Sequence, residues 1–277
     1  MKIYVPDYYK DFQCKADRCE HTCCVGWEID IDSDSLSRFR SMPEISPYIE
    51  EGETPHFRLD AGDRCPFLRQ DGLCEMIVRH GEDILCQICA DHPRFRNYWS
   101  DRVEIGLGLV CEEAARIILS REKPMALVLL EDDRRDGSAV VNTPCVSKAD
   151  TDSASDGNET DPDPFEAPET GSPEDTPEGM TEEERWLWDL RRELWDGIEE
   201  TGPEARLKEY LIFRHLPDAL YDGLLEERIS FIRSSWEEIT SAWRKTDGSL
   251  NALVEVVIRW SYDHEYDDDL QFGQEES

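Results

Sequence analysis

The chain has 277 residues, of which 64 are acidic and 30 basic, giving a formal net charge of -34 at pH 7. A charge of this sign repels DNA, RNA and anionic lipid, so we expect neither nucleic acid nor a membrane surface as a partner. Charged residues make up 34% of the chain, against about a quarter in typical globular domains. We therefore expect part of the chain to remain unpacked.

The amino terminus shows no targeting signal. Its first residues, MKIYVPDYYKDFQ, lack the run of about seven apolar residues of a signal peptide, and no later stretch approaches about 18 consecutive apolar residues. These observations predict a cytoplasmic protein. In a reducing cytosol, cysteines are expected to bind metal or act in catalysis rather than to form disulfides.

The cysteines are concentrated near the amino terminus. Of the ten cysteines, nine lie at positions 14, 19, 23, 24, 65, 74, 86, 89 and 111, and the tenth is Cys145. Turn signals such as Asp71-Gly72 and His92-Pro93 break this part of the chain into short apolar runs. We predict a cysteine-rich, metal-organised module with irregular segments over residues 1–120.

An acidic segment follows over residues 131–180. From Ala149 through Glu184 the sequence contains no Lys, Arg or His, and a segment with so much like charge and so little apolar surface does not pack. We predict a disordered linker there, with Cys145 at its edge and not a ligand. A short acidic tail is expected over residues 266–277.

Residues 181–265 are predicted to be helical, so the fold class is mainly α. Thr181 and Glu184 form a capping box, and apolar residues then recur at helical spacing until Gly202-Pro203. Further helices are predicted over about 203–214, 219–244 and 250–261. Their Trp and Leu residues are typical of the inner face of a helical bundle.

The cysteine spacing indicates metal binding. Thiolates are soft ligands that suit zinc or iron–sulfur clusters, and each tetrahedral site takes four protein ligands, so eight or nine thiols are enough for one or two sites. The adjacent Cys23 and Cys24 would point to opposite sides of an extended chain. One can then bind a metal while its neighbour binds a second metal or packs, which predicts a junction within a metal-organised core.

The identity of the metal is left open by the spacing. The Cys-x2-Cys pair usual for zinc occurs once, at Cys86 and Cys89, and the expected second pair is missing. This favours an iron–sulfur cluster over zinc. His21, His80 and His92 are candidates for a mixed zinc site, although a histidine near such a cluster is more often a hydrogen-bonding neighbour.

Five motifs follow one another along the first part of the chain: PDYYKDFQC, CEHTCCVGW, CPFL with DGLCEM, LCQICADHPRFRN and GLGLVCEEAARIIL. Together they resemble those of the flagellin lysine-N-methylase family and of a related group of zinc- or iron-chelating cysteine-cluster proteins. The resemblance covers roughly residues 4 to 120, and it continues more weakly through KEYLIFRHLPDALYDG and YDHEYDDDL. The acidic tract of residues 149–184 departs from the family, which continues there with ordered sequence.

The resemblance implies an activity and a set of ligands. It implies transfer of a methyl group from S-adenosylmethionine to lysines of flagellin, with an iron–sulfur cluster, or alternatively zinc, bound by some of the thiols. The cysteines that match the family are Cys14, Cys19, Cys23, Cys24, Cys65, Cys74, Cys89 and Cys111. Cys86 is an additional thiol without an assigned role.

Catalytic and donor-binding residues are not predicted. The segment VEIGLGLV, residues 103–110, superficially resembles a methyltransferase glycine loop, but we interpret it as a turn preceding Cys111 because the rest of that motif is missing. Tyr8, Tyr9 and Trp27 could surround a methylammonium group, although core packing is the more common role.

Two alternatives to a methyltransferase remain open. The thiols could bind zinc or iron in a non-catalytic module that serves structure or protein interaction. They could also form an exposed, labile centre in a redox or metal-handling protein.

Overall fold

The computed structural model describes residues 1–132 and 179–265. The predicted linker over residues 131–180 and the predicted tail over residues 266–277 therefore lie almost wholly outside the described residues, as does Cys145. No helix in the described part of the chain is both long and apolar enough to cross a membrane.

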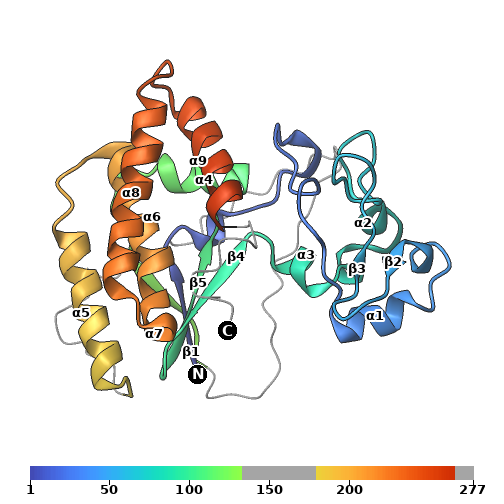
Figure 1. The fold of residues 1–277 in the computed structure, drawn as a ribbon, viewed down its shortest axis with the longest axis horizontal. Helices are drawn as coiled ribbons and strands as arrows, with labels where there is room; N and C mark the ends of the chain where they lie inside the picture. The colour runs from blue at the N-terminus through green and yellow to red at the C-terminus, as the bar shows by residue number, and fades with distance from the viewer. Residues whose placement is uncertain (133–178, 266–277) are drawn as a thin grey trace, which may run out of the picture.

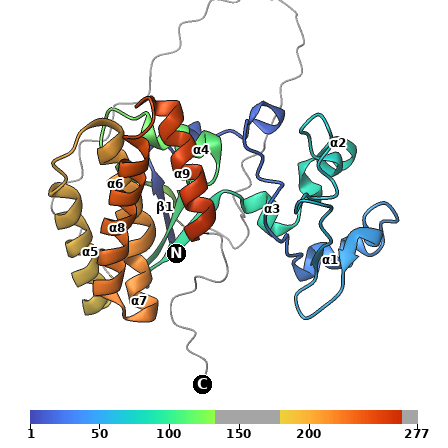
Figure 2. The same ribbon diagram turned by 45° about the horizontal axis from the view of Figure 1, so that its top comes forward.

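Two lobes are visible in Figure 1 and remain separate when the molecule is turned in Figure 2. The cysteine lobe comprises residues 13–92, and the helical lobe comprises the other described residues. Each lobe has its own cluster of buried apolar side chains. The first 120 residues contribute to both clusters, and the predicted domain boundaries stay a prediction.

A four-stranded mixed sheet lies in the helical lobe. Its strands are β1 (Lys2–Pro6), β4 (Arg94–Tyr98), β5 (Arg102–Leu107) and β6 (Leu127–Asp132), in the order β4-β5-β1-β6. β1 pairs with β5 in parallel, whereas the outer pairs are antiparallel. The chain leaves this sheet after β1, forms the cysteine lobe and returns as β4. The mainly α prediction is thus confirmed for the carboxy-terminal region but omitted this sheet.

Helices cover the sheet in the helical lobe (Figure 1). They are α4 (Glu112–Leu119), α5 (Glu182–Asp196), α6 (Gly202–His215), α7 (Ala219–Asp222), α8 (Leu225–Trp243) and α9 (Leu250–Glu265), with the 3-10 turn η5 (Leu216–Asp218). The predicted capping box is confirmed, because the Thr181 hydroxyl accepts from the Glu184 N–H and the Glu184 carboxylate accepts from the Thr181 N–H. A single helix over 219–244 is wrong, since Gly223 adopts a left-handed conformation with φ 71° and separates α7 from α8.

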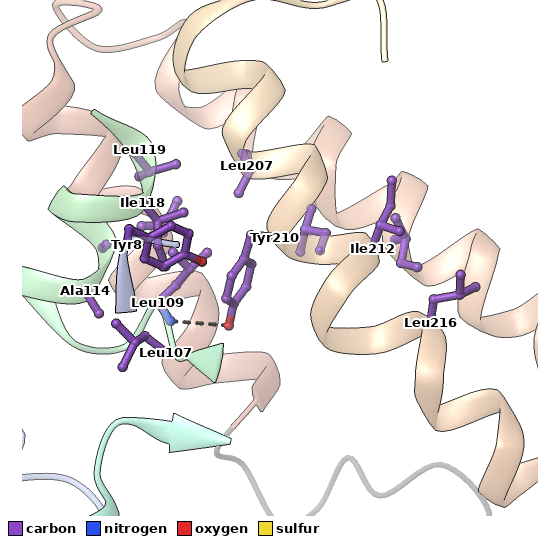
Figure 3. Close-up of a cluster of buried hydrophobic side chains, with 14 of the residues drawn as sticks. Tyr8, Leu107, Leu109, Ala114, Ile118, Leu119, Leu207, Tyr210, Ile212 and Leu216 are labelled. Carbon is purple, nitrogen blue, oxygen red and sulfur yellow. Dashed lines mark hydrogen bonds between the residues drawn. The ribbon is translucent and has the colours of Figure 1, made fainter. Parts of the chain in front are cut away.

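The core of the helical lobe joins α6 to the sheet and to α4. Figure 3 shows Tyr210 of α6 close to Leu109, which lies two residues after the end of β5. The Leu109 N–H donates to the Tyr210 hydroxyl over 3.3 Å. The same hydroxyl donates to the Glu265 carboxylate over 2.9 Å. The segment that precedes Cys111 is therefore fixed by buried contacts.

The cysteine lobe consists of short elements, as predicted for an irregular segment. They are η2 (Ala16–Arg18), α1 (Ser33–Phe39), η3 (Ser46–Tyr48), β2 (Ile49–Glu50), β3 (His56–Phe57), α2 (Glu75–His80), η4 (Glu82–Ile84) and α3 (Gln87–Asp91), with η1 (Tyr9–Asp11) just before them. Phe57 packs at the centre of the lobe, 5.6 Å from Phe39 and 5.0 Å from Phe67 between ring centroids. With so little regular structure, the lobe depends on this small apolar core.

Candidate metal centre

Three of the thiols lie at the starts of helices. Cys74, Cys86 and Cys111 are the residues immediately before the first residues of α2, α3 and α4. The first N–H groups of a helix have no partner within the helix, and the helix dipole favours negative charge there. The helix starts therefore oppose the effect of burial, which nevertheless raises the pKa of Cys74 and Cys111, whereas the pKa of Cys86 is lowered, mainly by a hydrogen bond from Cys89.

Backbone N–H groups also converge on the sulfurs. The sulfurs of Cys65, Cys74 and Cys111 each accept from N–H groups two and three residues further along the chain. The Cys14 sulfur accepts from the Ala16 N–H over 3.4 Å. Hydrogen bonds to sulfur stabilise the thiolate and tune a bound metal or cluster. This donor arrangement fits thiolate ligation.

The protein alone does not deprotonate most of these thiols. Burial raises the pKa of Cys65 and Cys111 to about 12, although the backbone N–H groups oppose the rise. Burial, together with the Glu112 carboxylate, raises the pKa of Cys19 to about 11. A bound cation would reverse this effect, because metal ligation deprotonates a thiol.

One group of thiols lies in the core of the cysteine lobe. Cys65 and Cys86 are buried in its apolar cluster, and Cys24, Cys74 and Cys89 pack against that cluster. The Cys65 N–H donates to the Cys24 carbonyl over 2.9 Å, which brings these two residues side by side. We call these five residues the inner group.

A second group lies between the two lobes. The thiols of Cys14 and Cys19 are close enough to Cys111 to influence its pKa, and Cys23 is influenced in turn by Cys111 and Cys14. Cys111 packs against the core of the helical lobe, not that of the cysteine lobe. We call these four residues the junction group.

Cys23 and Cys24 connect the two groups. Their side chains are hydrogen-bonded, and the Cys23 thiol donates to Cys24 and lowers the pKa of Cys24 to about 7. That bond, burial and neighbouring thiols raise the pKa of Cys23. Cys23 is exposed and Cys24 is half-buried.

The segment that carries the junction thiols is held against the helical lobe by polar contacts. The Glu112 carboxylate accepts from the N–H groups of Glu20 and His21 over 2.7 and 3.2 Å. Lys15 forms an ion pair with Glu113. Glu112 and Glu113 follow Cys111 directly, so these contacts fix the loop of Cys14 to Cys23 beside the start of α4.

The thiols are near one another but do not form a coordination shell. Within residues 1–132 and 179–265, no three or more His, Cys, Asp or Glu side chains stand in an arrangement that would hold a metal ion. The three candidate histidines have other contacts. The His80 imidazole pairs with Glu44 over 3.2 Å and that of His92 stacks on Trp27 at 5.8 Å, whereas the contact of His21 is made by its backbone N–H, which donates to Glu112.

Other motif residues turn out to be structural. The Arg94 side chain donates to the Tyr9 hydroxyl over 2.8 Å and lies over the ring of Phe12, so two motifs far apart in the sequence meet. Tyr8 and Tyr9 are buried in the core of the helical lobe, which agrees with the packing role. Sequence reasoning missed the partners of Arg94, although its place in the motif ADHPRF was a signal.

The glycines of residues 103–110 also have structural roles. A Cβ at Gly106 would collide with the rings of Phe95 and Phe213. The Gly108 N–H donates to the Pro93 carbonyl over 2.7 Å. Together they let β5 pack closely and let the chain turn toward Cys111. Most of residues 103–110 is thus strand, and the predicted turn is limited to the end of the segment.

A pocket of about 320 Å³ lies next to the inner group. Its lining includes Glu44, Tyr48, Phe67, Met76 and Arg79. The N–H groups of Phe67 and Met76 donate to the sulfurs two residues before them, so two walls of the pocket are attached to thiols of the inner group. Its volume is in the range of small-molecule sites.

Comparison with known proteins supports the resemblance carried by the motifs. No family model and no solved structure matches the chain. Over 139 residues, 46% of this chain, it is 25% identical to the flagellar biosynthetic protein FliU of Salmonella muenchen, and the match covers 82% of that protein. Over the same share of this chain it is 25% identical to proteins named lysine-N-methylase from Salmonella choleraesuis and Salmonella typhimurium.

The match covers 35% of each lysine-N-methylase, so the chain spans about a third of the length of those relatives. The resemblance to the flagellin lysine-N-methylase family that the cysteine motifs predicted is thus confirmed by sequence similarity to proteins of that name.

Proposed function

We propose that the chain is a protein-lysine N-methyltransferase that uses S-adenosylmethionine, acts on flagellin, and binds an iron–sulfur cluster through its thiols. One observation carries the proposal: all eight cysteines that match the family lie in the two neighbouring thiol groups, in a chain similar to proteins named lysine-N-methylase. The flagellar name of FliU supports flagellin as the substrate. The cytoplasmic location expected from the sequence stays a prediction.

The reaction places two demands on the protein. The lysine nitrogen attacks the methyl carbon of the sulfonium, the C–S bond breaks with its electrons going to sulfur, and the methylated amine loses a proton. A lysine with a pKa near 10.4 must first lose its proton, at a cost of about 4.6 kcal/mol at pH 7. Burial and the nearby sulfonium charge both reduce that cost, whereas carboxylates increase it.

The acidic character of the chain fits recruitment of the substrate more than its activation. A net charge of -34 attracts a cationic lysine from a distance. Close to the reacting amine, the same carboxylates would hold the proton in place. We therefore assign electrostatic steering to the acidic surface and name no catalytic base.

We place the methyl donor in the pocket next to the inner group. Tyr48 and Phe67, whose ring centroids are 5.2 Å apart, offer aromatic surface to an adenine ring. Glu44 suits the cationic sulfonium and ammonium groups, and Arg79 suits the carboxylate of the donor. Because two walls are bonded to thiols, metal loading would also order this pocket.

The test is methyl transfer by anaerobically purified, iron- and sulfide-reconstituted protein. With isotopically labelled S-adenosylmethionine, label is expected on lysines of purified flagellin, located by peptide mass spectrometry. Flagellin whose lysines have been chemically dimethylated beforehand serves as the control and should accept much less label. Absence of label on both flagellin and a lysine-rich protein would refute the enzyme proposal.

A non-catalytic metal-binding module is the second candidate, and the packing of the inner thiols in the core of the cysteine lobe favours it. Its signature would be metal-dependent stability of the fold without any stabilisation by the methyl donor.

A further inference from the structure

We propose that the acidic tail, residues 266–277, docks on the open edge of the sheet and adds to β4 as a parallel strand. The inference is independent of the proposed function, because it involves neither the thiols nor the pocket assigned to the methyl donor. It identifies an interaction surface on β4 and the segment of this chain that fits it.

β4 is the outermost strand on one side of the sheet. The Trp99 N–H donates to the Arg102 carbonyl over 2.9 Å, and the Gly108 N–H donates to the Pro93 carbonyl over 2.7 Å. Because hydrogen-bonded pairs alternate along an antiparallel ladder, the odd-numbered residues of β4 bond to β5. The even-numbered residues of β4 point their N–H and C=O groups outward.

Tyr221 of α7 closes one of the three outward positions. Its hydroxyl accepts from the Tyr98 N–H over 3.2 Å and donates to the Tyr98 carbonyl over 2.6 Å, so a phenol makes both bonds that a neighbouring strand would make. Within residues 1–132 and 179–265, the outward backbone groups of Arg94 and Arg96 have no hydrogen-bond partner. An open edge of this kind is a template for pairing with another extended segment.

The described chain ends beside this edge. Figures 1 and 2 both show the carboxy-terminal end of α9 next to the start of β4. The Glu265 carboxylate accepts from the Tyr210 hydroxyl over 2.9 Å and lies 3.0 Å from Nε2 of His215. Tyr210 in turn packs on Phe95 of β4, with 6.2 Å between ring centroids. A segment that continues from Glu265 toward Tyr98 therefore runs parallel to β4.

The charges at this edge fit the tail. Residues 267–269 are three consecutive aspartates. The Arg214 guanidinium lies 4.6 Å from the ring centroid of Phe95 and is close enough to the Glu265 carboxylate to interact with its charge. The Arg94 guanidinium donates to a tyrosine hydroxyl and to a backbone carbonyl, neither of which carries a charge. Carboxylates that follow Glu265 along β4 would thus meet positive charge.

The tail is also long enough for this pairing. A strand advances about 3.3 Å per residue, so about five residues cover the length of β4. Twelve residues, 266–277, follow Glu265. This assigns residues 267–271 to the edge and leaves Glu275 and Glu276 beyond it.

The test is amide hydrogen exchange at single-residue resolution, in the full chain and in a chain that ends at Tyr266. An amide that loses a hydrogen bond of typical net strength should exchange at least about fivefold faster. We expect that acceleration at Arg94 and Arg96 in the shortened chain, with unchanged protection of Phe95 and Asn97.

Equal exchange of Arg94 and Arg96 in the two chains would overturn the proposal. Fast exchange in both would mean that the edge is solvated. Protection in both that increases with protein concentration would mean that a second copy of the chain covers the edge. Either result would leave the proposed methylase unaffected.

Two full-length variants keep the test decisive if the shortened chain does not fold. One carries Asp267→Asn and Asp268→Asn, and the other carries Glu275→Gln and Glu276→Gln, so each loses two negative charges. Exchange at Arg94 and Arg96 should accelerate about twofold or more in the first, since exposed ion pairs contribute small free energies, and should not change in the second. The same rates in both variants would refute docking of residues 267–271 on this edge.

Discussion

Arg191 of α5 and Glu104 of β5 form an ion pair whose side chains are 1% and 0% exposed. The guanidinium donates to both carboxylate oxygens, over 2.6 and 2.8 Å. Its face lies 4.3 Å from the ring centroid of Trp188 and 5.0 Å from that of Trp195. The pair links segments 87 residues apart in the chain and satisfies a charge at the centre of the sheet.

Replacing Arg191 by methionine should strongly destabilise the helical lobe. The Glu104 carboxylate would remain buried without its partner, and breaking a buried pair from one side costs about 3–5 kcal/mol. We expect the free energy of unfolding in urea to fall by that amount.

Arg192→Met is the matched control. Arg192 is the next residue of α5 and pairs with Asp189 over 3.1 Å, but both side chains are more than half exposed. Exposed pairs contribute little, so its urea midpoint should equal that of wild type. Equal losses in the two variants would mean that α5 itself, and not the buried pair, is sensitive to substitution.

Gly26→Ala tests the contact between the lobes. Gly26 has φ 95°, and a Cβ there would lie 2.8 Å from the Tyr262 hydroxyl oxygen on α9. The variant combines a left-handed alanine, at about 1 kcal/mol, with overpacking that costs about 1–3 kcal/mol. We expect a loss of about 2–4 kcal/mol in urea unfolding.

Gly62→Ala separates these two effects. Gly62 also has a positive φ of 77°, but no atom lies within 4 Å of a Cβ there. The free energy of unfolding of the Gly62→Ala variant should fall only by the cost of the left-handed alanine, without the cost of overpacking. If both variants are equally destabilised, the Tyr262 ring does not lie close enough to Gly26 in solution to collide with an added Cβ.

The helices of residues 181–265 could be predicted because their signals are local. The capping box of Thr181 and the 3.6-residue spacing of apolar side chains each involve neighbours within one or two turns. Gly223 was overlooked, since a glycine within an apolar periodic run resembles a tolerated interior residue until its φ is known. The sheet was missed because β1 pairs with β5 about 100 residues later, and the sequence of either strand alone does not indicate its partner.

The thiols of the candidate site could be identified from the sequence, but their grouping could not. Residue type and spacing predict ligation, and the adjacent Cys23 and Cys24 predict a junction. The assignment of Cys111 to the same side as Cys14 depends on where α4 packs, which is a tertiary contact. The pocket in which we propose that the donor binds could not be predicted for the same reason, because Tyr48 and Met76 meet only in the folded lobe.

Tyr48→Ala should weaken binding of the methyl donor product, S-adenosylhomocysteine. Loss of one aromatic ring stacked on a base costs about 1–3 kcal/mol, so calorimetry should give a dissociation constant at least about fivefold higher. Tyr221→Ala is the control, since Tyr221 is 62% exposed on the helical lobe, away from the pocket. Unchanged affinity in the correctly folded Tyr48 variant would place the donor elsewhere.

His92→Phe should make the protein less sensitive to acid. Burial, with a smaller effect of Arg94, lowers the pKa of His92 to about 4, so the unfolded chain, with a histidine pKa near 6.5, binds this proton more readily than the folded chain. The contribution of neutral His92 is fully present above about pH 6.5 and is lost between about pH 6.5 and 4. This contribution to the free energy of unfolding amounts to about 3 kcal/mol.

Phenylalanine keeps a ring against Trp27, which lies 5.8 Å from the imidazole, but cannot bind a proton. Urea unfolding at about pH 7 and about pH 4 should therefore show that wild type loses about 3 kcal/mol more on acidification than the variant. Comparing the two losses removes the effect of the many carboxylates, because both proteins share them. Parallel losses would mean that the imidazole is hydrated in solution and titrates as an ordinary histidine.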